Sequence, residues 1–561
     1  MRKILVLASV LAIPGFLYAQ SAFDAYRLSQ PDLKGTARFM GMAGAFTALG
    51  GDLSTLSQNP GGIGVYRNSD IGFTLDLDCQ NSSSSVPGLN NKETVDQTKF
   101  LLNNIGFVWT VKLPSSTCPN INFGFTYNKS TSFNRRYAGW MPLNGSLSNL
   151  IAANASSMGY SESQLYGDNP YFPDKGYGAD WLSILGYNSY LISAKPGAVN
   201  QYIGQWGQTT SGTGYFDVLE SGSVDSYNIA LGGNIKNTFY WGMDFDITHM
   251  NYNLNPIWEE DLNDAYIENG DHQIQKMKAN WDLYNLYNCS GTGFNFKLGF
   301  IVKPIQELRL GFSFATPTWY NLTETYLAGV DYSYDGSKWF NEETNGGVPA
   351  YDSFNLRTPW KINAGIAGVL FNRLIVSADY EWNNYGAMKY SAASPSYYDP
   401  WTDNPWYDPY DPWWYSASPD TRAGYIENNP YYETNQDISN YYKSSNTIRI
   451  GAEFRITNRF SVRAGYSYIS SPVKNVVKDG KEMVVTAGTM PNYRVDNSTN
   501  YVTAGLGYNI GHFYVDAAYV YKHMDSDFHA YSPDPADFIT SPTSKLSLNN
   551  SQVVLSAGFK F

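Results

Sequence analysis

A period of two in apolar and polar residues runs through the chain from Ser69 onward. Successive side chains of a β-strand point to opposite faces, so this period predicts strands with one apolar and one polar face. Fourteen segments share the pattern: Ile71–Leu77, Ile105–Val111, Ile121–Tyr127, Tyr227–Leu231, Phe239–Ile247, Phe294–Phe300, Leu308–Phe314, Trp360–Ile366, Leu374–Tyr380, Ile448–Phe454, Phe460–Tyr466, Val502–Tyr508, Phe513–Tyr519 and Val553–Phe561.

The two faces of these strands differ in a way that separates two all-β architectures. The apolar face is rich in aromatic residues, whereas the opposite face carries the charges. These are Asp244, Asp246, Lys297, Arg309, Lys361, Asp379, Glu381, Arg449, Glu453 and Arg463. A charge facing lipid costs about 2–4 kcal/mol at the bilayer midplane. The pattern therefore favours a transmembrane barrel over a soluble β-sandwich, which alternation alone would also allow.

The connections between the strands alternate in length. Short links at Pro114–Pro119, Lys236–Asn237, Pro304–Gln306, Phe371–Asn372, Thr457–Asn458 and Ile510–Gly511 are separated by long polar loops. Short turns at one end and long loops at the other are typical of outer-membrane barrels, which have an even number of strands. We predict an all-β fold, a fourteen-stranded antiparallel transmembrane barrel over residues 69–561.

A glycine-rich segment, Gly35–Asn68, precedes the first strand and lacks the pattern of a helix or a strand. In the barrel, twelve of the fourteen strands carry a glycine on the polar face. Barrel bending explains such glycines, and so does a lumen cleared for a folded segment. We predict a hatch over residues 20–68, with gate residues Gly35, Gly41, Gly44, Asn59, Pro60 and Gly61.

Residues 1–19 have a charged start and an apolar middle, which predicts a secretory signal peptide. The net charge of -12 argues against nucleic-acid binding, which requires basic patches. Three cysteines and five histidines form no metal-ligand spacing, and no catalytic motif is present. We therefore expect no enzyme activity, no cofactor and no metal.

Several short motifs carry a family resemblance. They are Asn59-Pro60 at the end of the glycine-rich segment, Gly311–Pro317, Thr358–Ile362, Val462–Tyr468 and Val502–Tyr508. Together they resemble the FadL/OmpP1 outer-membrane transporters, with Gly61 where that family usually has alanine. The resemblance implies a fourteen-stranded barrel plugged by a hatch, in the bacterial outer membrane.

For function, the resemblance implies passive uptake of hydrophobic small molecules, such as long-chain fatty acids or aromatic hydrocarbons. Ligand would dock at extracellular loops, reach a site near the hatch and leave sideways through the barrel wall. Expected partners are this ligand, outer-membrane lipid and the barrel assembly machinery through Phe561, with the protein acting as a monomer. A surface glycan- or haem-binding protein and an unselective porin are the alternatives.

Two long loops and a few charged residues complete the predictions. Residues 133–224 form an extracellular insertion with two helical patterns, and 391–444 is an extracellular loop repeating Asp or Asn, Pro and an aromatic residue. A fatty-acid carboxylate would need a cation in the lumen, for which the candidates are Arg309, Lys361, Arg449 and Arg463. Pairing of these cations with Asp379, Glu381 and Glu453 across strands is the competing interpretation. Phe23, near the processed N-terminus, is a further ligand-binding candidate by analogy with the family.

Overall fold

The fourteen predicted strands close into one barrel. The structure is a computed structural model that describes residues 20–89, 91–167, 170–171, 178–268, 273–393 and 430–561. Within these ranges every wall strand pairs antiparallel with its neighbours, and β21 pairs with β1 to close the ring. The wall strands are β1 (Asp70–Ser85), β2 (Glu93–Lys112), β3 (Asn120–Ser132), β7 (Ser211–Ile235), β8 (Phe239–Glu268), β9 (Ile274–Val302), β10 (Leu308–Ala315), β14 (Lys361–Leu370), β15 (Leu374–Asn384), β17 (Ser444–Arg455), β18 (Phe460–Ile469), β19 (Tyr493–Ile510), β20 (Phe513–His529) and β21 (Thr543–Lys560).

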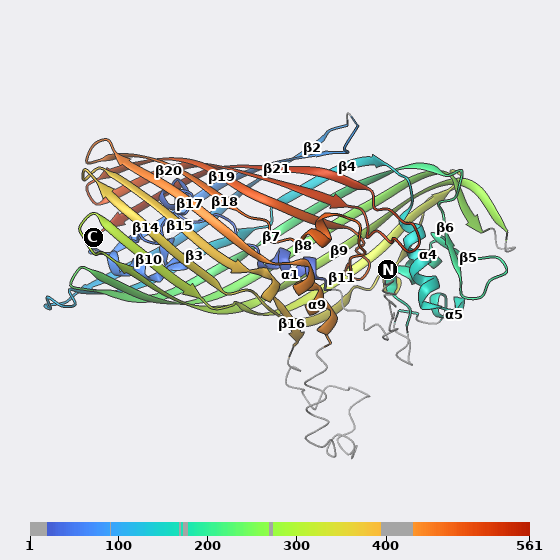
Figure 1. The fold of residues 1–561 in the computed structure, drawn as a ribbon, viewed down its shortest axis with the longest axis horizontal. Helices are drawn as coiled ribbons and strands as arrows, with labels where there is room; N and C mark the ends of the chain where they lie inside the picture. The colour runs from blue at the N-terminus through green and yellow to red at the C-terminus, as the bar shows by residue number, and fades with distance from the viewer. Residues whose placement is uncertain (1–19, 90, 168–169, 172–177, 269–272, 394–429) are drawn as a thin grey trace, which may run out of the picture.

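The barrel is long, and its two ends are built differently (Figure 1). Short turns and the C-terminus share one end; Lys236-Asn237 and Phe371-Asn372 turn there with φ between 52° and 56°. At the other end the wall is continued by further strands. They are β4 (Arg135–Pro142), β11 (Trp319–Tyr334), β12 (Phe340–Glu343), β13 (Ala350–Arg357) and β16 (Lys389–Ala392). We call the half with the short turns the lower barrel and the other half the upper barrel.

The orientation of apolar side chains inverts between the two halves. In the lower part of β8, Phe245 and Ile247 face outward, while Asp244 and Asp246 are buried inside. Farther along the same strand, Tyr252 is 1% exposed and faces inward. The pairing of β8 with β9 continues across this change. The lower barrel is thus apolar outside and the upper barrel is apolar inside, as expected for a wall that leaves a membrane and enters water.

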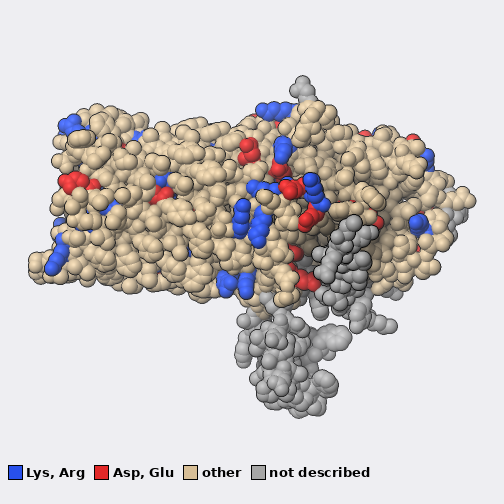
Figure 2. Space-filling view, in the orientation of Figure 1, with Lys and Arg blue, Asp and Glu red and all other residues tan. Residues whose placement is uncertain are grey.

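Charged side chains follow the same division. Figure 2 shows a broad band of the shaft with few charges, bordered by acidic and basic groups. The lower-barrel charges Lys297, Glu453 and Arg463 are buried in the lumen. Among the described residues, no helix is long and apolar enough to span a membrane.

The predicted helical insertion of 133–224 is only partly helical. It contains α4 (Leu147–Met158), α5 (Glu162–Leu165) and α6 (Trp181–Asn188), and the first and third coincide with the two helical patterns in the sequence. It also contains β4, the short pair β5 (Ile192–Ala194) and β6 (Tyr202–Gly204), and the first half of β7. The sequence did not predict these strands, because their apolar residues point inward, whereas the prediction relied on apolar residues that face lipid.

The N-terminal segment lies inside the barrel. In the lower half it forms α2 (Ala37–Met40), α3 (Thr55–Gln58) and η1 (Pro60–Val65), whose apolar side chains are buried against the wall. In the upper half, α1 (Ala22–Ser29) packs in an aromatic core beside α9 (Tyr432–Tyr441). The remaining described elements are η2 (Thr344–Gly347), η3 (Tyr385–Ala387) and α10 (Asn475–Lys478). The expected signal peptide and the aromatic repeats at 399–414 lie outside the described residues.

Candidate functional site

Of the predicted hatch, residues 20–68, the segment 34–65 occupies the lower lumen, and from here on we use the name hatch for this segment. The wall receives it through glycines. A Cβ on Gly299 would lie 2.7 Å from the backbone nitrogen of Gly61, and one on Gly311 would lie 2.7 Å from the Cα of Ala48. Neither distance is compatible with a side chain. Wall glycines whose added Cβ would meet the hatch within 3.4 Å are Gly72, Gly124, Gly232, Gly242, Gly299, Gly311, Gly365, Gly451, Gly465 and Gly505. The lumen is therefore cleared for backbone-to-backbone contact.

Hydrogen bonds fix the hatch to the wall from several directions. The Thr47 amide donates to Asp379 at 2.7 Å, and the Arg309 guanidinium donates to the Leu49 carbonyl at 2.6 Å. Arg38 forms an ion pair of 2.9 Å with Glu453. The first two contacts use wall charges to satisfy hatch backbone groups, as buried polar groups require, and the third joins a hatch side chain to the wall.

The predicted gate residues have identifiable backbone roles in the hatch. Gly35 (φ 144°) and Gly44 (φ 73°) adopt backbone angles that L side chains rarely tolerate. Gly41 lies against Gly505 of the wall. The Asn59 side chain accepts a hydrogen bond of 2.9 Å from the Gly61 amide, and Pro60 begins η1, so the pair caps the last hatch turn.

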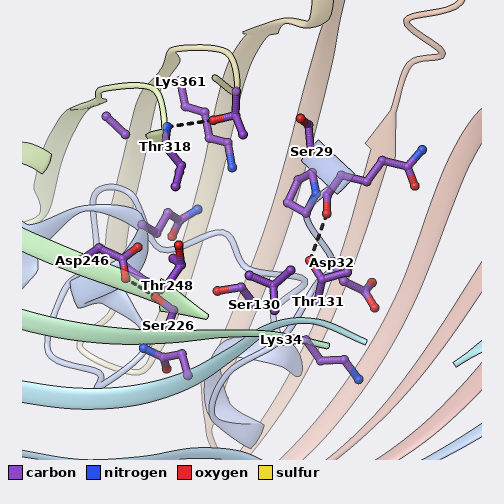
Figure 3. Close-up of a pocket in the computed structure, with 18 of the residues that line it drawn as sticks. Ser29, Asp32, Lys34, Ser130, Thr131, Ser226, Asp246, Thr248, Thr318 and Lys361 are labelled. Atoms are coloured by element: carbon purple, nitrogen blue, oxygen red, sulfur yellow. Dashed lines mark hydrogen bonds between the residues drawn. The ribbon is translucent and has the colours of Figure 1, made fainter. Parts of the chain in front are cut away.

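A cavity of about 210 Å³ lies on top of the hatch (Figure 3). The end of α1 contributes Ser29, its connection to α2 contributes Asp32 and Lys34, and the opposite wall contributes Thr318 and Lys361. Polar residues outnumber apolar ones along the lining, but apolar groups contribute about as much of its surface. A polar head group would find donors on several sides, and an apolar tail would find apolar contacts beside them.

The cations around this cavity differ in how they are paired. Lys297 lies between Asp244 and Asp246, at 3.1 and 2.8 Å, and Lys34 lies between Asp76 and Asp78. The Lys361 side chain makes no hydrogen bond or ion pair with any described residue. In Figure 3 its amino group points into the open space.

Arg449 is the second cation with spare hydrogen-bonding capacity. One of its nitrogens pairs with Glu381 at 2.9 Å, while Nη1 is buried without a partner among the described residues. A buried unpaired donor is costly. Lys361 and Arg449 together thus form an incompletely neutralised cationic corner of the cavity.

The titration of Asp32 shows how strongly the cavity floor is ionised. Burial raises the pKa of this carboxyl, but the positive charges of Lys522, 3.2 Å away, and of Lys34 lower it by more. The resulting pKa is about 2. Asp32 is therefore a carboxylate at neutral pH and, with Tyr501 donating to it at 2.8 Å, holds the α1–α2 connection against β19.

The wall beside the cavity has a seam where two strand pairs are interrupted. β10 ends before Thr316-Pro317 and β14 begins after Thr358-Pro359, and both prolines lack the N–H that a strand ladder needs. Threonine hydroxyls substitute: Thr358 Oγ1 accepts from the Thr318 amide at 2.8 Å. Outside, Phe314 and Trp360 stack over the seam with centroids 4.9 Å apart.

Comparison with known proteins identifies the family. The family model described as outer membrane protein transport protein (OMPP1/FadL/TodX) matches residues 222–560. The chain belongs to this family. It is accordingly a transport barrel of the outer membrane and not an enzyme, and the expected fold and location are confirmed.

Three solved structures are similar to this OMPP1/FadL/TodX member. A Pseudomonas aeruginosa FadL homologue is 11% identical, with a TM-score of 0.50. The alignment covers 95% of this chain and 99% of the homologue. The P. putida toluene transporter TodX is 12% identical, with coverages of 94% and 99% and a TM-score of 0.46. The Ralstonia pickettii toluene transporter TbuX is 13% identical, with the same coverages and a TM-score of 0.44. No curated protein sequence matches the chain.

The structure separates the five predicted ligand-binding residues of this family member. Lys361 and Arg449 meet at the cavity. Arg463 is buried between Glu453 and Asp516, and Arg309 is bonded to the hatch. Phe23 lies outside the lumen cavity, in the upper core between Tyr441 and Tyr493. The expected cross-strand pairing holds for Arg449 and Arg463, whereas Asp379 binds the hatch backbone instead.

Sequence reasoning missed the cavity floor and the seam. The sequence gives no prediction for Lys34 and Asp32, because their partners on β1 and β20 are distant in sequence. The repeated Thr-Pro pair at 316–317 and 358–359 was noted only as a family motif. The two Thr-Pro pairs lie at the upper ends of β10 and β14, which are neighbours in the barrel. Their repetition indicates that the strand ladder is interrupted at the same level in both strands.

Proposed function

We propose that the protein takes up hydrophobic small molecules with an anionic head group, of which long-chain fatty acids are the prime candidates. The observation that carries this proposal is the Lys361 side chain, which has no hydrogen-bond or ion-pair partner among the described residues and points into the cavity beside Arg449. A carboxylate would satisfy both cations through charge-assisted hydrogen bonds. An unsubstituted aromatic hydrocarbon would leave them unsatisfied.

The size of the cavity constrains the binding mode. About 210 Å³ is below the usual range of about 300–1,000 Å³ for sites that enclose a drug-sized ligand. We infer that the head group occupies the cavity and that the tail extends past the seam at Thr316–Thr318 and Thr358–Pro359. The apolar Phe314 and Trp360 cover that seam on the lipid side.

For the route, we propose docking at the upper barrel, transfer to the cavity and release controlled by movement of the hatch. The hatch fills the lumen below the cavity through ten glycine contacts, which opposes an unselective porin. The seam offers a sideways exit that requires breaking few ladder hydrogen bonds. Recognition of Phe561 by the barrel assembly machinery and a monomeric state stay predictions.

The test compares two ligands that share a tail and differ in the head group. The full-length protein in detergent should bind dodecanoate about tenfold more tightly than dodecanol, as expected for one buried charge-assisted contact. Lys361→Gln should abolish this preference while leaving dodecanol binding unchanged. Lys195→Gln, at an exposed lysine of the upper barrel, is the matched control.

Two outcomes would contradict the proposal. The first is an unchanged preference for dodecanoate in Lys361→Gln. The second is binding of toluene by the parent protein that dodecanoate does not displace, which would favour the aromatic-hydrocarbon alternative.

A further inference from the structure

The upper boundary of the membrane band is marked by tyrosines on the outer wall. Tyr380 donates to Asn446 at 2.6 Å, and Tyr466 donates to Asn500 at 2.7 Å, each across a strand pair. Tyr521 donates to Asn549 at 2.7 Å in the same way. Aromatic residues with a polar end collect at the membrane–water interface, so these three bonds locate the head-group level.

A basic surface lies directly above this level on one side of the barrel. Lys443 is three residues before Asn446 along the chain, about 10 Å at the rise of a strand. Residues 474–481, which include α10, add Lys474, Lys478 and Lys481. Lys474 donates to the Ser439 carbonyl at 2.6 Å, which ties this segment to α9 and to Lys443. We call Lys443, Lys474, Lys478 and Lys481 the lysine patch.

The lysine patch has no ion-pair partner in the part of the chain that the structure describes, although Asp479 and Glu482 lie in the same segment. Figure 2 shows basic and acidic side chains gathered at this border of the uncharged band. By contrast, lysines inside the lumen, such as Lys34 and Lys297, each contact two carboxylates.

Two exposed apolar side chains accompany the lysines. Met483 is 59% exposed and Val485 is 58% exposed, while Val484 between them is buried. The Val485 amide donates to the Tyr441 hydroxyl at 3.1 Å, which holds this stretch against the end of α9. Lysines beside exposed apolar groups at head-group depth match a lipid that has phosphates above and acyl chains below.

We propose that the lysine patch binds the phosphorylated head group of an outer-leaflet lipid, with Met483 and Val485 against its upper acyl region. The site is separate from the lumen cavity and does not depend on the transported ligand. It would fix the depth and rotation of the barrel relative to the lipids beside β17 and β18.

The experiment measures lipid binding to the full-length protein in phosphatidylcholine nanodiscs doped with diphosphoryl lipid A. The variant carries Lys443→Gln, Lys474→Gln, Lys478→Gln and Lys481→Gln, and the matched control carries Lys195→Gln, Lys276→Gln and Lys338→Gln at exposed lysines farther out. Loss of several lysines near an anionic surface should weaken lipid A binding by more than about tenfold. The control should bind as the parent does. Heat-modifiable migration of each variant in gels verifies a folded barrel.

Equal lipid A binding by the folded patch variant and the control would overturn the proposal. Displacement of lipid A by inorganic phosphate at equal concentration would also overturn it, because the site would then recognise a free anion. A protein with Met483→Ser and Val485→Ser should bind lipid A more weakly than the parent does. Adding the four lysine substitutions to it should weaken binding again, as expected if the lysines and the apolar side chains contact different parts of one lipid.

Discussion

The lower and upper halves of this barrel occlude the same lumen with opposite means. Below the cavity, wall glycines let the backbone of the hatch approach the backbone of the wall, and buried charges satisfy its polar groups. Above the cavity, α1 is held by large side chains, such as Phe23 between Tyr441 and Tyr493. The lower contact depends on the absence of side chains and the upper one on their presence. Added volume should therefore harm the lower plug, and removed volume the upper one.

The largest effect is expected from Gly299→Val. The new side chain would overlap Asn59 and Gly61, and overpacking of this kind costs about 1–3 kcal/mol. That cost shifts the equilibrium between the seated and the displaced hatch toward the displaced state by about fivefold to a hundredfold. Planar-bilayer recordings should show steady ion conductance in the variant.

The control for this prediction is Gly368→Ala, another wall glycine. An added Cβ there has only the Glu307 carbonyl within 4 Å, at 3.9 Å. This variant should stay as silent as the parent. Conductance that rises equally in both variants would mean that wall perturbation, not hatch displacement, opens the barrel.

An effect that is smaller in conductance, although larger in stability, is expected from Phe23→Ala. Truncating a buried Phe costs about 3–5 kcal/mol, and here the loss falls on the aromatic core of the upper barrel. Amides of α1 should exchange with deuterium faster, while conductance stays low because the hatch remains seated. Tyr166→Ala, at an exposed aromatic residue, is the control that should change neither. A conducting Phe23→Ala would show that the two plugs are coupled.

The smallest effect concerns the link between the two plugs. The folded pKa of Asp32, about 2, lies below the ordinary value of an aspartate, so its ionised form stabilises the fold. This stabilisation is complete above about pH 4 and is lost as the pH falls through about 2. The amides of residues 32–34 should be protected evenly against hydrogen exchange from pH 7 to 5 once corrected for intrinsic rate, and this protection should weaken below about pH 4. Asp32→Asn should remove that dependence; an unchanged profile would contradict the assigned role.

The sequence predicted the lower half well because a membrane imposes one simple rule on a wall strand. Apolar residues at odd positions of β8, such as Phe245 and Ile247, indicated its outer face, and the wall glycines indicated a filled lumen. The upper half escaped prediction because the rule inverts there. From Met250 to Leu254 the apolar residues move to even positions. This change looks like the end of the strand pattern unless the outer face is expected to pass from lipid to water.

The candidate site was predictable only in part for a related reason. Lys361 and Arg449 were found because they interrupt a strand pattern on a known face. Lys34 and Asp32 were not, since a hatch without periodicity gives no indication of which side chains meet the wall. Their partners Asp76 and Lys522 lie 42 and 490 residues away along the chain.

The central claim is that the hatch alone closes the lower barrel, and deletion of Gly35–Gly62 tests it most directly. The measurement is single-channel conductance of the deleted barrel, beside the full-length chain, after both are verified as folded by heat-modifiable migration. The account predicts a steadily conducting pore for the deletion and near silence for the full chain. A folded deletion barrel that remains as tight as the full-length protein would contradict it.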